Sequence, residues 1–113
     1  MNCLNSLILG GTVASVMEDG VFLLSTSRYY KDGEELKEEK SVFSVAVYGK
    51  LAEFSKDKLI LNRGVRIVGR LKQDKWTDSE GNEFSKVIVV AEHIEYKPML
   101  KKEVKAEDTE VTF

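Results

Sequence analysis

The chain has 113 residues, which is enough for one domain with its own hydrophobic core but too few for two. Its 42% apolar and 32% charged content is ordinary for a globular protein, and no apolar run approaches the roughly 20 residues that cross a bilayer. The single cysteine, Cys3, excludes an internal disulfide and suits a reducing cytoplasm, and the first residues lack the basic start and cleavage site of a signal peptide.

Strand signals dominate the first part of the chain. Residues 4–17 predict a long strand, in which the pair Gly10 and Gly11 indicates a bulge or a sharp bend. A turn at residues 18–20 leads into a return strand at residues 21–30, so this part of the chain predicts a hairpin.

A polar segment, a strand and a helix are predicted next. Residues 31–40 are too charged for the core, and we expect them to form a mobile hairpin tip before a strand at residues 41–49. Residues 50–61 give the one good helical pattern, because apolar side chains recur there at helical spacing. Gly64 follows at a distance that suits the end of this helix.

The last part of the chain predicts two more strands. They are residues 65–76 and 84–96, joined by a turn-rich loop at residues 77–82, and Pro98 ends the fold. Three strands, one helix and two strands match an all-β, five-stranded Greek-key barrel of the OB type with one helix between strands 3 and 4. Other small β-barrels could also carry an inserted helix. We expect this domain at residues 1–97 and a flexible acidic tail at residues 98–113.

Basic and aromatic side chains gather in the middle of the chain. Residues 44–76 carry eight Lys or Arg against three acids, a local net charge of +5, while the whole chain has −2. Tyr48 and Trp76 stand among these cations on segments predicted as strands. Rings that stack on bases and cations that meet phosphates are typical of surfaces for single-stranded nucleic acid. The alternative is a solvated, charge-rich sheet with one buried Trp.

Four sequence blocks, found in the right order over residues 4–96, resemble a known family. These four blocks are contained in three longer runs, NSLILGGTVAS, VYGKLAEF and NRGVRIVGRLKQDKWTDSEGNEF, and together they resemble the bacterial single-stranded DNA-binding protein family. The resemblance implies an OB barrel that binds single-stranded DNA without sequence preference during replication, recombination and repair. It also implies a cytoplasmic, nucleoid-associated homotetramer, with a dimer as the alternative.

The resemblance implies a set of DNA-binding residues. Tyr48 and Trp76 match base-stacking positions, and Tyr29 falls near a third, with Tyr30 one residue away. The cations expected to meet phosphates are Lys50, Arg70, Lys72 and Lys75.

The chain also departs from the family pattern. A stacking tryptophan of the third strand falls on Val42 and a neighbouring basic position on Ser44, so one ring and one cation are missing. Phe43 takes the place of a histidine at a subunit contact, although a register shift of one residue would put it on the nucleic acid instead. We expect Phe43 at the subunit interface together with Leu4 and Leu7.

The end of the chain is acidic and closes on phenylalanine. Family members end in an acidic stretch with a final Pro-Phe that docks on replication and repair proteins, and here Thr112 replaces the proline. A solubilising tail is the alternative. The residues expected to dock are Glu107, Asp108, Glu110 and Phe113.

Catalytic chemistry has little support in the sequence. His93 is the single histidine, so with Cys3 it provides no zinc ligand set, and the glycines form no phosphate-binding loop. We therefore expect no enzyme activity, metal, cofactor or membrane partner. Two other functions stay open. One is an accessory OB-fold subunit of the primosome type that acts through a protein partner, and the other is a protein-interaction subunit without a nucleic-acid role.

Overall fold

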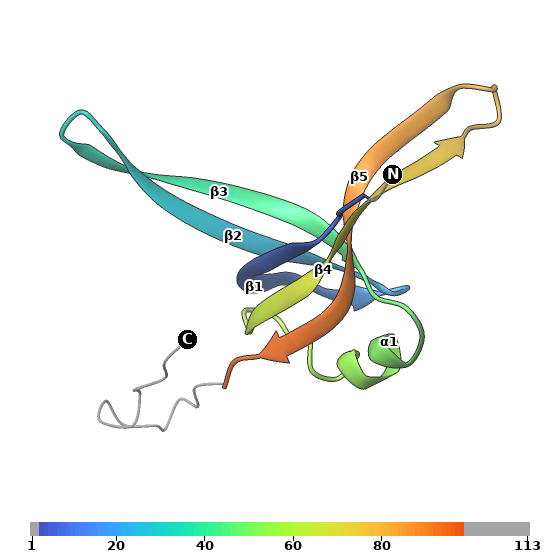
Figure 1. The fold of residues 1–113 in the computed structure, drawn as a ribbon, viewed down its shortest axis with the longest axis horizontal. Helices are drawn as coiled ribbons and strands as arrows, with labels where there is room; N and C mark the ends of the chain where they lie inside the picture. Colours follow the sequence, from blue (N-terminus) through green and yellow to red (C-terminus); the bar gives the residue numbers. More distant parts are fainter. Residues whose placement is uncertain (1–2, 99–113) are drawn as a thin grey trace.

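A computed structural model describes residues 3–98 as five strands and one short helix (Figure 1). In chain order they are β1 (Leu7–Glu18), β2 (Val21–Asp32), β3 (Glu35–Ala46), α1 (Gly49–Ser55), β4 (Gly64–Thr77) and β5 (Glu83–Tyr96). The strands close into a barrel in the order β1-β2-β3-β5-β4, and every pairing is antiparallel except that of β3 with β5. The predicted five-stranded OB barrel, with its helix between the third and fourth strands, is confirmed.

The core fills the inside of this barrel with apolar side chains from all five strands. Side chains alternate between the two faces of a strand, so the barrel part of each strand turns one face toward the core, while the ends of β2 and β3 beyond it are exposed. Burying these side chains away from water supplies the main stabilisation of the fold. The fully buried members include Val13, Phe22, Leu24, Val45, Val65 and Ile67, and Leu59 joins them from the segment after α1.

Two hairpins extend beyond the barrel in different directions (Figure 1). The strands β2 and β3 stay paired as far as Asp32 and Glu35, and β4 and β5 as far as Thr77 and Glu83. We call residues 26–41 the β2–β3 arm and residues 70–90 the β4–β5 arm. Among residues 3–98, no helix has the length and apolar character needed to cross a membrane.

The polar segment at residues 31–40 is not only a hairpin tip, as predicted, but mostly strand. All of it is exposed, as its charge indicates, yet the β2–β3 pairing runs through it without a register shift. The turn is tight and contains Gly33, whose φ is 69°. Backbone pairing holds these strands together without a core, and cross-strand neighbours such as Arg28 and Glu39 carry opposite charges.

The predicted helix at residues 50–61 is wrong beyond Ser55. The Ser55 carbonyl accepts hydrogen bonds from the backbone N–H groups of both Lys58 and Leu59, each at 2.9 Å, and the chain turns there. Leu59 then enters the barrel core from a turn, which explains the apolar spacing without a longer helix. Gly64 begins β4 instead of ending the helix, and Asn62 takes the positive φ of 71° before it.

The glycine pair in β1 does not mark a bulge. The β1–β4 register is continuous from Leu7 to Thr12, and the irregularities in the β1–β2 pairing lie further on, between Val13 and Glu18. Gly11 is needed for a different reason, because a Cβ there would overlap the carbonyl group of Ser25 in β2. Gly11 therefore marks a close approach of two backbones, whereas a Cβ at Gly10 would meet only an ordinary contact.

Candidate nucleic-acid interface

The strand register separates the predicted site residues onto two faces of one sheet. Phe22, Val45 and Val89 point into the core, which defines the inner face of β2, β3 and β5. The β2–β3 pairing has no register shift, and the β4–β5 pairing has none beyond Gly69, so the alternation can be followed along both arms. The opposite, outer face carries Tyr29, Val42, Arg70, Lys72 and Trp76. The inner face carries Tyr30, Phe43 and Lys75.

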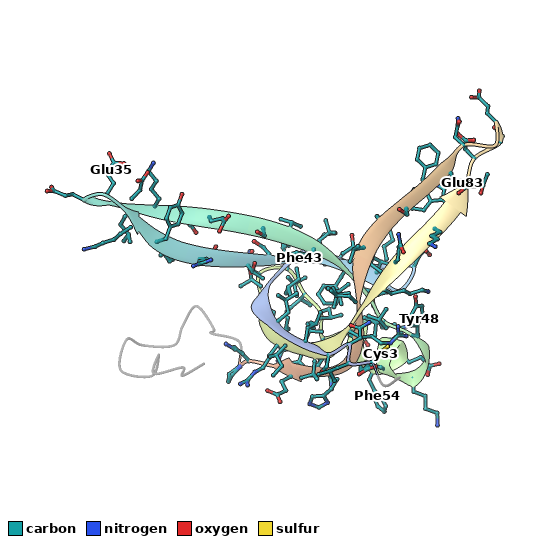
Figure 2. The ribbon with its side chains drawn as sticks, turned by 45° about the horizontal axis from the view of Figure 1, so that its top comes forward. Cys3, Glu35, Phe43, Tyr48, Phe54 and Glu83 are labelled. Atoms are coloured by element: carbon teal, nitrogen blue, oxygen red, sulfur yellow. The ribbon has the colours of Figure 1, made fainter. Side chains whose placement is uncertain are left out.

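Tyr48 and Lys72 are brought together beside the base of the β4–β5 arm. Tyr48 directly precedes α1 in an extended conformation and is exposed, and Figure 2 shows it beside the helix. The Lys72 ammonium lies 5.8 Å from the centroid of the Tyr48 ring, a cation–π contact. A predicted stacking ring and a predicted phosphate ligand therefore form one exposed unit.

Trp76 lies near the tip of the β4–β5 arm, well outside the core. It stands directly opposite Phe84 in the register, and the two rings are stacked with centroids 5.7 Å apart and an interplanar angle of 19°. Trp76 is 45% exposed, so the alternative of a buried core tryptophan is wrong. The sequence analysis missed Phe84, although a hairpin that closes around residues 77–82 would have placed it opposite Trp76.

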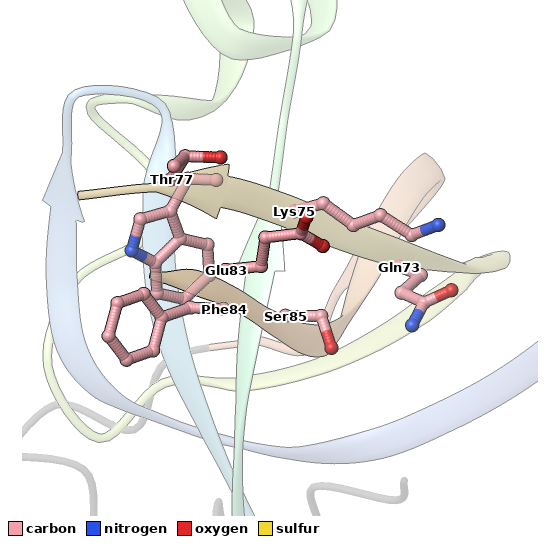
Figure 3. A pocket seen from close by; sticks show the side chains of 7 residues that line it. Gln73, Lys75, Thr77, Glu83, Phe84 and Ser85 are labelled. Atoms are coloured by element: carbon pink, nitrogen blue, oxygen red, sulfur yellow. The ribbon is translucent and has the colours of Figure 1, made fainter. Parts of the chain in front are cut away.

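A hollow of about 400 Å³ lies beside these two rings (Figure 3). Gln73, Lys75 and Ser85 line it from the inner face of the arm, and the edges of Trp76 and Phe84 border it. Lys75 is therefore close to the indole but on the other side of the ribbon from Lys72.

The loop between Trp76 and Phe84 is organised by one carboxylate. Asp78 Oδ1 accepts hydrogen bonds from the backbone N–H groups of Asn82 (2.8 Å) and Glu80 (2.9 Å), and Oδ2 accepts one from Asn82 Nδ2 at 3.1 Å. The Asn82 backbone hydrogen bond is the largest of the causes that lower the pKa of Asp78, because it favours the charged form. The loop thus has a defined shape that holds the two strands at the tip.

The other predicted cations have different surroundings. Arg70 pairs with Glu92 (3.4 Å) on the neighbouring strand, and both side chains are about half exposed, so the pair adds little stability. Lys50 lies in the first turn of α1 beside Tyr48 in the chain and lines a second hollow with Glu53 and Phe54. Lys50 is therefore at the surface near Tyr48 in the chain, and Arg70 is at the surface at the base of the arm.

Two of the predicted subunit contacts, Leu4 and Leu7, lie just before and at the start of β1, which has an open edge, and Phe43 lies on β3 opposite Leu24. Residues 7–11 pair with β4, whereas pairing with β2 begins only at Thr12, so within residues 3–98 the other edge of this segment has no strand partner. Leu4 is almost fully exposed, Leu7 packs partly on the core, and Phe43 is 39% exposed.

The predicted docking residues Glu107, Asp108, Glu110 and Phe113 lie outside the described residues. No group of three or more His, Cys, Asp and Glu suited to a metal ion occurs among residues 3–98.

A closed OB barrel with exposed rings and cations on one face defines a class of small β-barrels that bind nucleic acid or oligosaccharides. The chain matches the model of the Single-strand binding protein family over residues 4–97, and it therefore belongs to that family. The family consists of non-enzymatic DNA-binding proteins, so the prediction that the chain is not an enzyme is confirmed.

Individual relatives agree with this assignment. The chain is 43% identical over 79 residues to a single-stranded DNA-binding protein of Aquifex aeolicus (strain VF5), which covers 65% of the chain and 50% of the relative. It is 30% identical over 74 residues to one of Treponema pallidum (strain Nichols), with 66% and 42% covered. The chain thus spans about half the length of these relatives.

Solved structures with the same fold include two from Plasmodium falciparum and Streptomyces coelicolor. The Plasmodium falciparum SSB in complex with ssDNA aligns with a TM-score of 0.70 and 21% identity, covering 85% of this chain and 97% of that one. A small single-stranded DNA-binding protein from Streptomyces coelicolor aligns with a TM-score of 0.62 and 22% identity, covering 85% and 95%. At these identities the likeness establishes the barrel fold.

Proposed function

We propose that this chain binds single-stranded DNA without sequence preference through the outer face of its sheet. The observation that supports this best is the pair of exposed ring units on the β4–β5 side of the outer face, Tyr48 with Lys72 and Trp76 with Phe84. Every nucleobase has a π-face, so stacking holds any sequence, and each base–aromatic stack contributes about 1–3 kcal/mol.

The order of the exposed rings on the outer face gives the path that we propose for the DNA strand. Tyr29 on the β2–β3 arm, Tyr48 at the base and Trp76 on the β4–β5 arm offer successive stacking sites. Between Tyr29 and Tyr48 the outer face presents Val42, which is 56% exposed and cannot stack. Arg70 and Lys72 on this face neutralise phosphates between the bases. Lys50 adds a cation near Tyr48 in the chain, and Lys75 meets phosphates that pass the inner face of the arm.

Fluorescence titration with oligo-dT at low salt tests the proposal directly. Trp76 is the single tryptophan, so its emission reports on this site alone, and we expect base stacking to quench it. Absence of both quenching and binding would leave a protein-interaction subunit as the better description. Nuclease protection of bound DNA checks the proposed role in protecting strands during replication, recombination and repair.

The salt dependence of binding tests the role of the cations. The logarithm of the binding constant should fall linearly with that of the salt concentration, by about 0.7 for each phosphate neutralised on a single strand. Lys72→Ala should lower this slope because it removes one phosphate contact. Lys56→Ala, a matched change directly after α1 and on none of the strands, should leave the slope unchanged. A flat salt profile in the unchanged protein would contradict the basic surface.

We further propose that subunits of this protein assemble through the open edge of β1. Pairing of residues 7–11 with the same segment of a second copy would satisfy the free backbone groups of both edges symmetrically. Leu4, Leu7 and Phe43 would then bury apolar surface between copies. We propose a homotetramer, for which a dimer of this kind is the first step.

The tail proposal depends on the sequence. Acidic charge is combined with an aromatic ring in this segment, which suits a basic-rimmed apolar pocket on replication and repair proteins; the residues proposed to dock are Glu107, Asp108, Glu110 and Phe113. Deleting residues 107–113 should abolish such contacts and leave oligo-dT binding by the barrel intact. We also propose that the protein acts in the cytoplasm, at the nucleoid, where single-stranded DNA would be available to it.

A further inference from the structure

The side chain of Asn5 occupies a place in the β1–β4 ladder that a backbone would ordinarily fill. In the β1–β4 register Leu7 stands opposite Gly69, so the next position in phase pairs Asn5 with Leu71. There the Asn5 amide donates from Nδ2 to the Leu71 carbonyl at 2.7 Å, and its Oδ1 accepts from the Leu71 N–H at 2.9 Å. A side-chain amide thus replaces a peptide group and satisfies both polar groups of one residue.

This bond lies where β4 leaves the barrel. The β4–β5 pairing shifts register between Val68 and Gly69, and a Cβ at Gly69 would overlap the carbonyl oxygen of Val90. Beyond this bend, the β4 residues of the arm have only β5 as a strand partner among residues 3–98. The arm meets the rest of the sheet at two further positions, where Val89 and Val90 pair with β3. The Asn5 amide holds the other edge of the arm through backbone groups of Leu71, whereas Lys72 and Arg70 make exposed side-chain contacts with Tyr48 and Glu92.

Leu71 is adjacent to the residues that build the site. Lys72 follows it directly and lies over the Tyr48 ring, and Trp76 is five residues further along the same strand. The direction in which the arm leaves the barrel therefore sets the separation between the Tyr48 and Trp76 rings. A DNA strand that stacks on both rings at once binds more tightly if this separation is already fixed before it binds.

We propose that Asn5 is a positioning residue for DNA binding, which fixes the β4–β5 arm so that the Tyr48 and Trp76 sites act on one strand. The inference rests on the proposed function. Asn5 itself does not touch the DNA. Its effect appears only with ligands that span both rings, because a ligand on one ring does not depend on the direction of the arm.

The experiment compares Asn5→Ala with the unchanged protein on two lengths of oligo-dT. An OB fold covers about 4–16 nucleotides, so a dT of about 4 residues engages one ring site and one of about 16 spans both. We expect Asn5→Ala to weaken binding of the long oligomer about three- to tenfold and that of the short one hardly at all. Amide exchange at Leu71 should also become faster, since its N–H loses its acceptor.

Controls separate positioning from other roles. Ser6→Ala changes the neighbouring exposed side chain and should bind both oligomers normally. Asn5→Asp keeps an acceptor for the Leu71 N–H but sets a carboxylate oxygen against the Leu71 carbonyl in place of the donor. It should therefore also give a length-dependent loss, and it serves if Asn5→Ala does not fold.

Several results would overturn the inference. Equal losses for both oligomers would make Asn5 a direct contact, and unchanged affinity for the long one would remove it from the site. A loss of affinity that follows the melting temperature or the mass of the protein assembly, instead of the length of the DNA, would make the role of Asn5 structural. If the unchanged protein bound neither oligomer, the proposed function itself would fail.

Discussion

Phe84 covers one face of the Trp76 indole and leaves the other face available to a base. Trp76→Ala should weaken oligo-dT binding by about 1–3 kcal/mol, because it removes one base–aromatic stack. The melting temperature should hardly change, since the side chain lies outside the core. Fluorescence polarisation of labelled DNA and a thermal melt measure the two quantities.

Tyr30→Ala is the matched control for this change. Tyr30 has nearly the same exposure as Trp76, 43% against 45%, but it lies on the inner face. Its removal should therefore cost little affinity. If Tyr30→Ala weakened binding as much as Trp76→Ala did, the division of the sheet into a binding face and a non-binding face would be wrong.

Val42 is the position where a ring can be added to the outer face. Val42→Trp should tighten oligo-dT binding by about 1–3 kcal/mol, because it supplies a stacking platform in the gap between Tyr29 and Tyr48. Val42 is exposed, so the larger side chain needs no space in the core. Val87→Trp places the same ring at another exposed valine, on the inner face, and should give no gain. Equal gains from both would point to nonspecific stickiness of an added tryptophan.

Several single-residue roles could be predicted from the sequence, and others required the register. Tyr48, Lys72 and Trp76 stand in blocks whose residue types indicate stacking and phosphate contact, and the structure places all three at the surface of one sheet face. Phe84 and Asn5 could not be predicted, because their partners lie across a hairpin and across the barrel. The choice between Val42 and Phe43 also needed an unbroken β2–β3 register, which puts Val42 on the outer face.

The loop at the tip of the β4–β5 arm depends on the ionised Asp78 carboxylate. Its pKa is lowered in the folded loop, so the charged form contributes order above the ordinary aspartate pKa of about 3.9. That contribution should be lost as pH falls through the lower folded value. Trp76 fluorescence should therefore stay constant from neutral pH down to about pH 4 and change only below it.

Two variants check the source of this pH dependence. Asp78→Ala should show the altered Trp76 emission at every pH, because no acceptor remains for the Glu80 and Asn82 N–H groups. Asp78→Asn keeps an oxygen acceptor but no titrating group, so its emission should be flat with pH. A transition that persisted in Asp78→Asn would assign the effect to another carboxylate.

The elements themselves differ in how far the sequence determines them. The strands that line the core have clear alternation, and their order predicted the barrel. The helix at residues 50–61 was predicted too long because apolar spacing also fits a turn that delivers Leu59 to the core. The charged residues 31–40 gave no strand signal, since their pairing depends on the partner strand and not on burial.

For DNA binding, the local charge near the site and the symmetry of an assembly matter more than the net charge and the number of rings of a single subunit. The net charge of −2 does not prevent DNA binding, because the field near residues 44–76 decides where a polyanion docks. A single subunit lacks a ring at Val42. An assembly of subunits offers several such surfaces to one strand and raises the effective concentration of each after the first has bound. Assembly would thus compensate for the missing ring.

Phe43→Lys tests this assembly. Phe43 lies on the inner face where the β2–β3 arm joins the barrel (Figure 2), opposite Leu24, near the start of the β1–β2 pairing. In the proposed tetramer a lysine there would bury an unpaired charge between copies, so we expect dissociation into smaller species. Val42→Lys, the adjacent residue on the outer face, should leave the tetramer intact. Sedimentation at micromolar concentration measures both, with about four times 12.8 kDa expected for the unchanged protein. A stable monomer that bound long oligo-dT tightly would contradict the assembly, because one subunit would then suffice for binding.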